Sequence, residues 1–188
     1  MGVSWREAKV SDKKYLFEEW WEQCKRTRTM PQHLAEFRWL FDKVAYAEPL
    51  RILEIGTEKG GTLFFWSQLL CVVEDSVLVS VDLGDPHTIL DLESFPKQPI
   101  VIHGNSHDPK VLAQVVKYQP FDFLLIDGDH SYAGVKADYK DYSPLVKPGG
   151  LIAFHDIGLV GSVRRFWRQL RGNKQEMCKL MGMGLITK

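Results

Sequence analysis

Short apolar runs alternate with amphipathic stretches along most of the chain. The runs are rich in Val, Ile, Leu and Phe and do not alternate with polar residues, which predicts strands that are buried on both faces. We expect these strands at residues 51–55, 77–81, 100–103, 121–126 and 151–154. Buried strands separated by helices are typical of an α/β fold with a mainly parallel sheet, and such sheets bind ligands at the carboxyl ends of their strands.

Amphipathic stretches predict helices before, between and after these runs. The first helix, 11–25, starts at the cap signal Ser11-Asp12, and the second starts near Pro31 and stops before Pro49. Further helical spacing is present at residues 61–70, 109–117, 132–142 and 160–170.

The C-terminal third contains the remaining elements. The run Pro148-Gly149-Gly150 predicts a turn before the strand at 151–154. Two short segments, 175–180 and 183–187, are expected to pair as antiparallel strands at the edge of the sheet.

The length of 188 residues suits one domain. Within it, we expect residues 1–48 to form N-terminal helices that pack on the core, and residues 49–188 to form the ligand-binding core. The N-terminal part is rich in tryptophan, and these side chains either pack on the core or form a lid over a bound substrate. They are Trp5, Trp20, Trp21 and Trp39.

Charge and cysteine content narrow the classes of function. The 24 Lys and Arg residues balance 24 Asp and Glu residues, so a small-molecule partner is favoured over nucleic acid or a membrane surface. The three cysteines are widely spaced, no apolar run approaches the roughly 20 residues of a membrane span, and the N-terminus is unlike a signal peptide. We therefore expect a cytoplasmic protein; its oligomeric state stays open, and a homo-oligomer is compatible with the sequence.

A glycine-containing turn follows the first predicted strand. The segment Glu54-Ile55-Gly56-Thr57-Glu58-Lys59-Gly60-Gly61-Thr62 joins this strand to a helix, where glycine lets backbone amides approach a ligand. The dinucleotide pattern G-x-G-x-x-G is not met, because Thr57 and Glu58 follow Gly56. Glycines that serve only for packing are the structural alternative.

Two acidic residues accompany this turn. Asp82 follows the second predicted strand, where a carboxylate can accept hydrogen bonds from ribose hydroxyls, and Glu54 can contact the amino-acid end of a cationic cofactor directly or through water. A simple helix cap is the alternative role for Asp82. Their positions at strand ends together favour cofactor binding.

Further motifs accompany the turn, and the full set is Pro31-Gln32, Glu54-Ile55-Gly56 to Gly60-Gly61-Thr62, Val81-Asp82, Gly104-Asn105-Ser106, Ile126-Asp127-Gly128-Asp129-His130-Ser131-Tyr132, and Pro148-Gly149-Gly150 through His155-Asp156. With these motifs, the chain resembles the class I S-adenosylmethionine-dependent methyltransferases, and among them the small-molecule group of macrocin O-methyltransferase and cephalosporin hydroxylase-type proteins. The resemblance covers most of the chain. It implies a Rossmann-like fold whose seven-stranded, mainly parallel sheet has an antiparallel C-terminal edge and helices on both faces. It also implies S-adenosylmethionine as cofactor, with contacts expected from Glu54, Gly56, Thr57, Gly60, Gly61, Thr62, Asp82, Asn105, Ser106 and Asp127.

The resemblance further implies a divalent metal, usually magnesium, held by Asp127 and Asp156 at the ends of neighbouring strands. The position before Asp156 is commonly acidic in metal-binding relatives, but here it is His155, a softer ligand than magnesium prefers. His155 could bind a transition metal, hydrogen-bond to a water, or be a satisfied histidine at a strand end.

Methyl transfer to a hydroxyl also requires removal of its proton. His130 is the expected general base because an imidazole titrates near neutrality, and the resemblance implies this task for the matching histidine. Asp129 is the alternate base or its partner. A histidine that only caps the helix beginning near Ser131 is the structural alternative.

The expected function is therefore O-methylation of a small molecule, such as a sugar, a phenol or a natural product. Two other classes compete with it. One is an NAD-dependent oxidoreductase on a related sheet, and the other is a non-catalytic protein that binds S-adenosylmethionine as a sensor or partner subunit.

Overall fold

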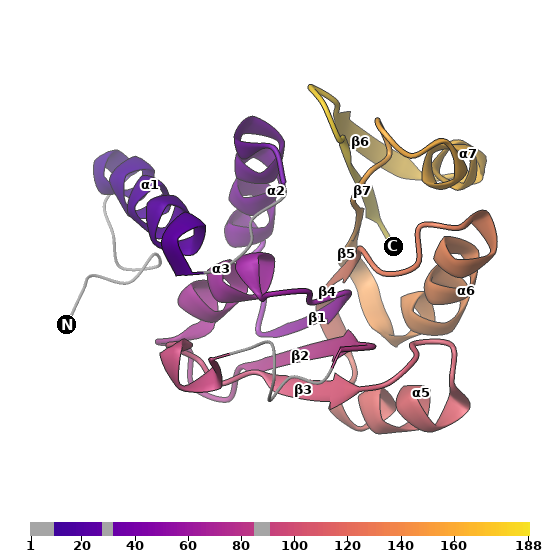
Figure 1. The fold of residues 1–188 in the computed structure, drawn as a ribbon, viewed down its shortest axis with the longest axis horizontal. Coiled ribbons are helices and arrows are strands. Elements are labelled where there is room, and N and C mark those ends of the chain that lie inside the picture. Colours follow the sequence, from indigo (N-terminus) through magenta and orange to yellow (C-terminus); the bar gives the residue numbers. More distant parts are fainter. Residues whose placement is uncertain (1–9, 28–31, 85–90) are drawn as a thin grey trace.

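The computed structural model describes residues 10–27, 32–84 and 91–188. These residues form a seven-stranded sheet with helices on both faces (Figure 1). The strands are β1 Arg51–Ile55, β2 Val77–Asp82, β3 Ile100–His103, β4 Phe121–Ile126, β5 Val146–Phe154, β6 Asn173–Met177 and β7 Met183–Thr187. The α-helices are α1 Val10–Thr27, α2 Leu34–Tyr46, α3 Gly61–Leu70, α5 Pro109–Val115, α6 Tyr132–Tyr142 and α7 Gly161–Gln169.

The strand order is β3-β2-β1-β4-β5-β7-β6. Strands β1 to β5 pair in parallel, whereas β7 runs antiparallel to both β5 and β6, as the sequence predicts for the C-terminal edge. The chain moves outward from β1 to β3 and then returns to β4 on the other side of β1. This reversal opens a crevice beyond the carboxyl ends of β1 and β4, which is where such sheets bind ligands.

The core lies in two layers, one on each face of the sheet. Alternate strand residues face opposite sides, so Ile52 packs with α1, α2 and α3 while Leu53 packs with α5, α6 and α7. Trp20 and Trp21 are buried in the first layer and Trp39 packs against it, whereas Trp5 lies outside the described residues. The described tryptophans of the N-terminal helices therefore contribute to the core.

The predicted and observed boundaries differ most for β5, β6 and the second helix. Strand β5 begins at Val146 and not at residue 151, because the run Pro148-Gly149-Gly150 belongs to the strand. The register of its pairing with β4 shifts in this part of the strand. Gly149 donates to the carbonyl of Lys188, which extends the sheet there. Strand β6 covers 173–177 in place of 175–180, and the second helix begins at Leu34.

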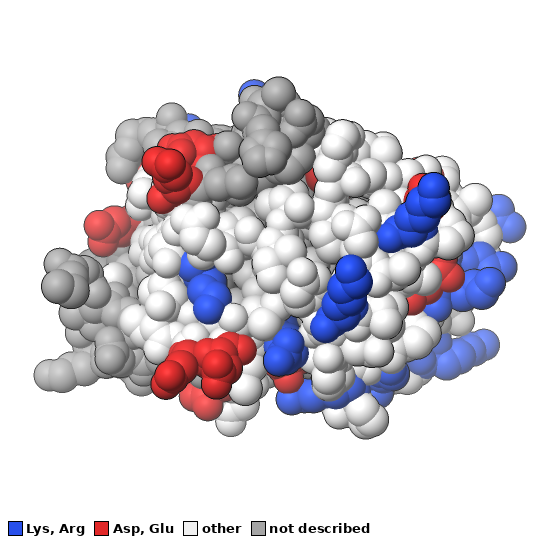
Figure 2. Space-filling view, turned by 90° about the horizontal axis from the view of Figure 1, so that it is seen from below, with Lys and Arg blue, Asp and Glu red and all other residues white. Residues whose placement is uncertain are grey.

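The surface carries charges of both signs. Figure 2 shows acidic and basic side chains on the same face, with the acidic ones toward one end and the basic ones toward the other. Among the described residues, no helix is both long and apolar enough to cross a membrane.

Candidate active site

A cavity of about 790 Å³ opens at the carboxyl ends of the central strands. Its walls come from the loops that follow β1, β2, β3, β4 and β5 and from the loop between β6 and β7. Most of the residues predicted from the sequence line it: Gly56, Thr57, Gly61, Thr62, Asp82, Asn105, Ser106, Asp127, Asp129, His130, His155 and Asp156.

The glycine turn after β1 approaches β4 very closely. Gly56 has φ +93°, and a Cβ atom there would lie 2.1 Å from the carbonyl oxygen of Asp127. Gly60 has φ +74° at the N-cap of α3, a conformation that favours glycine. The turn therefore brings backbone amides to the cavity wall and begins α3 there.

Asp82 holds the glycine turn against β2. Its Oδ2 accepts hydrogen bonds from the backbone N–H of Thr57 at 2.6 Å and of Glu58 at 3.0 Å, and its Oδ1 accepts one from Gly84 at 2.6 Å. The hydroxyl of Thr57 is also hydrogen-bonded to Ser80. Asp82 thus shapes the turn and still lines the cavity, but it does not cap α3, whose N-cap is Gly60 with no side-chain hydrogen bond.

Glu54 and Gly60 are the two predicted cofactor residues that do not line the cavity. Glu54 is fully buried beside α3, where its carboxylate accepts hydrogen bonds from Thr62 at 2.9 Å and Trp66 at 2.8 Å. Burial raises the pKa of Glu54 to about 8. Its side chain therefore links β1 to α3 in place of the cofactor contact expected from the sequence.

The loop after β3 is held by α6. Ser106 donates a hydrogen bond to Asp138 at 2.7 Å, and its carbonyl oxygen accepts one from the hydroxyl of Tyr142, also at 2.7 Å. Asn105 accepts a hydrogen bond from the backbone N–H of His107 at 2.9 Å. Both predicted residues of this loop, Asn105 and Ser106, are thereby fixed at the cavity wall.

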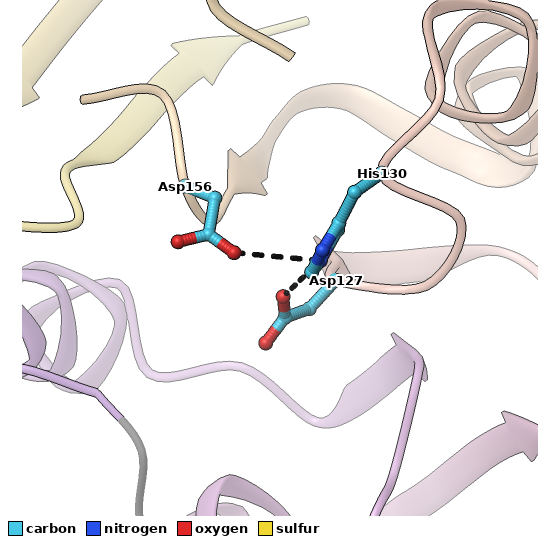
Figure 3. Close-up of side chains that lie close together, drawn as sticks. All are labelled: Asp127, His130 and Asp156. Atoms are coloured by element: carbon cyan, nitrogen blue, oxygen red, sulfur yellow. Dashed lines mark hydrogen bonds and ion pairs between the residues drawn. The ribbon is translucent and has the colours of Figure 1, made fainter. Parts of the chain in front are cut away.

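Two carboxylates and one imidazole converge where β4 and β5 end (Figure 3). Nε2 of His130 lies 3.2 Å from Oδ1 of Asp127 and 3.5 Å from Oδ2 of Asp156. One ligand atom from each of the three side chains falls within 4.8 Å of the others, a spacing that suits a metal ion. Register places Ile126 beside Phe154, which explains why the residues after these strands meet.

His155 lies beneath this cluster with only 4% of its side chain exposed. Its Nδ1 is 3.0 Å from Oδ1 of Asp127 and 3.3 Å from Oδ2 of Asp156, and it must carry a proton there because carboxylate oxygens only accept. Burial alone would lower the pKa of His155, but the negative charge of Asp127 and the hydrogen bonds to both carboxylates raise it to about 10. His155 is thus a donor to the two carboxylates, which differs from the metal-ligand role considered for it.

The contacts of Asp127 with His155 and His130 also shift the pKa values of Asp127 and His130. Burial opposes the charge of Asp127, yet the charge of His155 and the hydrogen bonds from both histidines hold the pKa of Asp127 below its usual value. The hydrogen bond to Asp127 raises the pKa of His130. Asp127 is therefore ionised at neutral pH and paired with both histidines.

In the loop from Asp127 to Ser131, neighbouring residues have different structural roles. Ser131 is the N-cap of α6 and accepts a hydrogen bond from the backbone N–H of Gly134, so His130 does not cap the helix. Asp129 accepts a hydrogen bond from the backbone N–H of Ser131 at 2.8 Å, which lowers the pKa of Asp129. A carboxylate with a lowered pKa is a weak base, which leaves His130 as the stronger candidate.

The cavity is also lined by residues for which no role was predicted. Nε2 of Gln32 donates to Oδ2 of Asp127 at 3.3 Å, and its Oε1 is buried without a hydrogen-bond partner among the described residues. Leu159 and Met181 line the cavity beyond the cluster. Gln32 had a signal in the motif Pro31-Gln32, whereas nothing in the sequence pattern marks Leu159 or Met181.

Comparison with known proteins gives a consistent picture. A family described as a methyltransferase domain matches residues 53–157, more than half of the chain. The demethylmacrocin O-methyltransferase of Streptomyces fradiae is 25% identical over 152 residues, covering 77% of this chain and 34% of that enzyme. The chain spans about a third to a half of the length of the curated relatives it matches.

Solved structures share the fold over most of the chain. The O-methyltransferase from Bacillus cereus in complex with SAH aligns with a TM-score of 0.67 at 19% identity, covering 96% of this chain and 92% of that one. The MycE methyltransferase of the mycinamycin biosynthetic pathway, in complex with Mg and SAH, aligns with a TM-score of 0.58 at 24% identity, covering 75% and 37%. The macrocin-type resemblance inferred from the motifs and the Rossmann-like fold are both confirmed, and the chain belongs to the methyltransferase domain family.

Proposed function

We propose that this chain is an S-adenosylmethionine-dependent methyltransferase that methylates a hydroxyl group of a small molecule. One arrangement carries the proposal: the glycine turn after β1, Asp82 after β2 and the cluster of Asp127, His130 and Asp156 line a single cavity. The relatives named above are O-methyltransferases, which supports a hydroxyl as the methyl acceptor.

The cofactor is assigned to the β2, β1 and β4 side of the cavity. Gly56 and Thr57 offer backbone groups at the start of α3, Asp82 offers carboxylate oxygens for the ribose hydroxyls, and Asn105 and Ser106 form the wall beyond β3. Gly61, Thr62 and Asp127 complete this set at the same wall. S-adenosylmethionine, when bound, supplies an electrophilic methyl group on its sulfonium.

The cluster of Asp127, His130 and Asp156 also fits a divalent cation. Two carboxylates provide hard oxygen ligands of the kind that magnesium prefers, and the spacing of the ligand atoms is short enough for one ion. Asp127 and Asp156 would hold the cation, with His155 fixing both carboxylates from the buried side. A bound cation would lower the pKa of the acceptor hydroxyl.

His130 is assigned as the general base. Its Nε2 faces Asp127 and Asp156, so in the neutral ring Nε2 carries the proton and Nδ1 is free to take the proton of the acceptor hydroxyl. Asp127 then orients the ring and stabilises the charge that forms on it. If Nε2 bound a cation instead, the remaining proton would sit on Nδ1, so the base and metal-ligand roles of His130 exclude each other.

Transfer of a labelled methyl group tests the proposal. The full chain is incubated with methyl-labelled S-adenosylmethionine and a panel of phenols, sugars and amines, with magnesium or with EDTA. We expect label in a hydroxyl-bearing acceptor and a loss of roughly 10²–10⁴-fold in kcat for His130→Ala.

A matched pair of carboxamide variants controls for indirect effects. Asp127→Asn should abolish any dependence of the rate on magnesium, while Asp42→Asn, in an exposed ion pair of α2, should behave like the unmodified chain. Absence of methyl transfer to every acceptor, together with absence of cofactor binding, would contradict the proposed function.

A further inference from the structure

The cavity wall is apolar at the end beyond β5. Leu159, in the segment after β5, lines the cavity with 60% of its surface exposed, and Met181, from the loop between β6 and β7, lines it beside Leu159. Leu83 also lines the cavity, but it follows Asp82 at the β2 end. The β5 end of the cavity therefore has a wall of two apolar side chains, whereas at the β2 end an apolar side chain stands next to the carboxylate of Asp82.

Direct contact between two loops builds this wall. The carbonyl oxygen of Met181 accepts hydrogen bonds from the backbone N–H of Gly158 at 2.7 Å and of Leu159 at 3.0 Å. Gly182 has φ +87°, and a Cβ atom there would lie 2.4 Å from the backbone nitrogen of Gly158. The two segments are therefore packed as closely as the backbone allows.

Glu36 of α2 fixes the same wall from behind. Its carboxylate is fully buried and accepts hydrogen bonds from the backbone N–H of Lys179, of Leu180 at 2.6 Å and of Met181 at 3.2 Å. Burial opposes its charge, but these backbone hydrogen bonds lower the pKa of Glu36, so it is ionised at neutral pH. These hydrogen bonds fix the backbone of the loop that carries Met181.

Strand order fixes the position of this wall relative to the reaction centre. The strands lie in the order β2, β1, β4, β5 and β7. Asp82 ends β2, Gly56, Asp127 and Asp156 follow β1, β4 and β5, and Met181 precedes β7. A cofactor on the β2 and β1 side places its methyl group toward Asp127. If the acceptor hydroxyl lies at Asp127 and His130, Leu159 and Met181 stand on the side of that hydroxyl away from the cofactor.

We propose that the acceptor carries an apolar ring directly beside the methylated hydroxyl, as a phenol does. Burial of an apolar ring against Leu159 and Met181 is favourable, whereas the leucine side chain offers no hydrogen bond to a sugar hydroxyl and the methionine sulfur is only a weak acceptor. This assignment of the acceptor class rests on the proposed function, because it takes the cluster of Asp127, His130 and Asp156 as the site of methyl transfer.

Binding of two probes to the SAH-loaded full chain tests the proposal. The probes are 4-methylphenol, which has one hydroxyl on an apolar ring, and methyl glucopyranoside, which has several hydroxyls and no apolar ring. By calorimetry we expect 4-methylphenol to bind at least roughly tenfold more tightly.

Two leucine variants locate the preference. Leu159→Ser should weaken 4-methylphenol binding by roughly tenfold and leave the Kd of SAH unchanged. Leu180→Ser is the matched control, since Leu180 is 58% exposed in the adjacent loop and does not line the cavity. It should change neither binding constant.

Equal or tighter binding of the glycoside would overturn the proposal, and so would equal effects of Leu159→Ser and Leu180→Ser on the phenol. If SAH binds and the phenol does not, the acceptor class is wrong and the proposed function stands. If SAH itself fails to bind the unmodified chain, the proposed function falls.

Discussion

At the scale of single residues, the cavity depends on backbone positions that tolerate little change. Gly56 lies so close to the carbonyl oxygen of Asp127 that it leaves no room for a side chain. Asp156 adopts φ +62°, which non-glycine residues rarely do unless their surroundings hold them. Asp156 is held by the segment that follows it, where the backbone N–H of Val160 donates to its carbonyl oxygen at 3.0 Å.

Gly56→Ala should destabilise the chain by roughly 2–4 kcal/mol, because it adds both a steric clash and an unfavourable φ. Gly149→Ala is the matched control, since Gly149 also has a positive φ, +78°, but nothing lies within 4 Å of a Cβ atom there. That variant should lose only about 1–2 kcal/mol. Urea denaturation measures both, and equal losses would show that the contact with Asp127 is unimportant.

Glu54 predicts a pH dependence of stability. Between about pH 4.5 and pH 8, the folded chain keeps a proton on Glu54 that the unfolded chain releases, so stability from this group falls as the pH rises through this window. The slope is about 1.4 kcal/mol per pH unit at most. Glu54→Gln should remove this part of the slope in denaturation experiments from pH 5 to 8; an unchanged slope would mean that Glu54 is ionised in the folded chain.

The residues of the site could be predicted where they directly follow a strand. Gly56, Asp82 and Asp127 were predicted because strand ends of a parallel sheet meet at one edge. Glu54 was assigned to the cofactor, but side chains alternate along a strand, and the carboxylate of Glu54 meets Thr62 and Trp66 of α3. The sequence alone does not indicate whether a buried carboxylate on a strand faces the ligand site or a neighbouring helix.

At the scale of elements, helix α6 positions the part of the cavity wall that contains Ser106, which we propose binds the cofactor. Asp138 and Tyr142, one turn apart, hold the hydroxyl and the carbonyl oxygen of Ser106. The sequence predicted α6 at residues 132–142 from its spacing, and the structure agrees. The sequence did not predict the contact between Ser106 and Tyr142, because these residues are 36 positions apart and are brought together by the fold.

Tyr142→Phe should weaken SAH binding about fivefold, since it removes one hydrogen bond that fixes Ser106. The control is Tyr139→Phe on the same helix, where the ring packs against Phe154 and Phe166 away from Ser106. Calorimetric titration with SAH measures both. Equal affinities of the two variants would show that α6 does not position the cofactor wall.

Element boundaries were predictable where apolar runs are sharp, as in β1, β4 and α3. The start of β5 was not, because Pro148-Gly149-Gly150 has the composition of a turn, yet Val146 pairs with Phe121 and the two glycines are hydrogen-bonded to Lys188. The end of β6 was likewise set by its pairing with β7, from Asn173 opposite Thr187 to Met177 opposite Met183. Tertiary pairing decides such boundaries.

At the scale of the whole molecule, segments far apart in sequence complete the cavity. Gln32 contacts Asp127 over 95 residues, and Glu36 contacts Met181 over 145 residues. Both contacts join the segment around the start of α2 to residues that line the cavity, Asp127 and Met181. No periodicity in the sequence predicts them, because they depend on how α2 packs beside β7.

Binding of S-adenosylmethionine in the cavity, with Asp82 as a ligand, can be measured by calorimetric titration. We expect saturable binding of S-adenosylmethionine by the unmodified chain, no comparable binding of NAD, and an affinity at least about tenfold weaker for Asp82→Ala. Binding of NAD in place of S-adenosylmethionine, or no binding of either, would contradict this expectation.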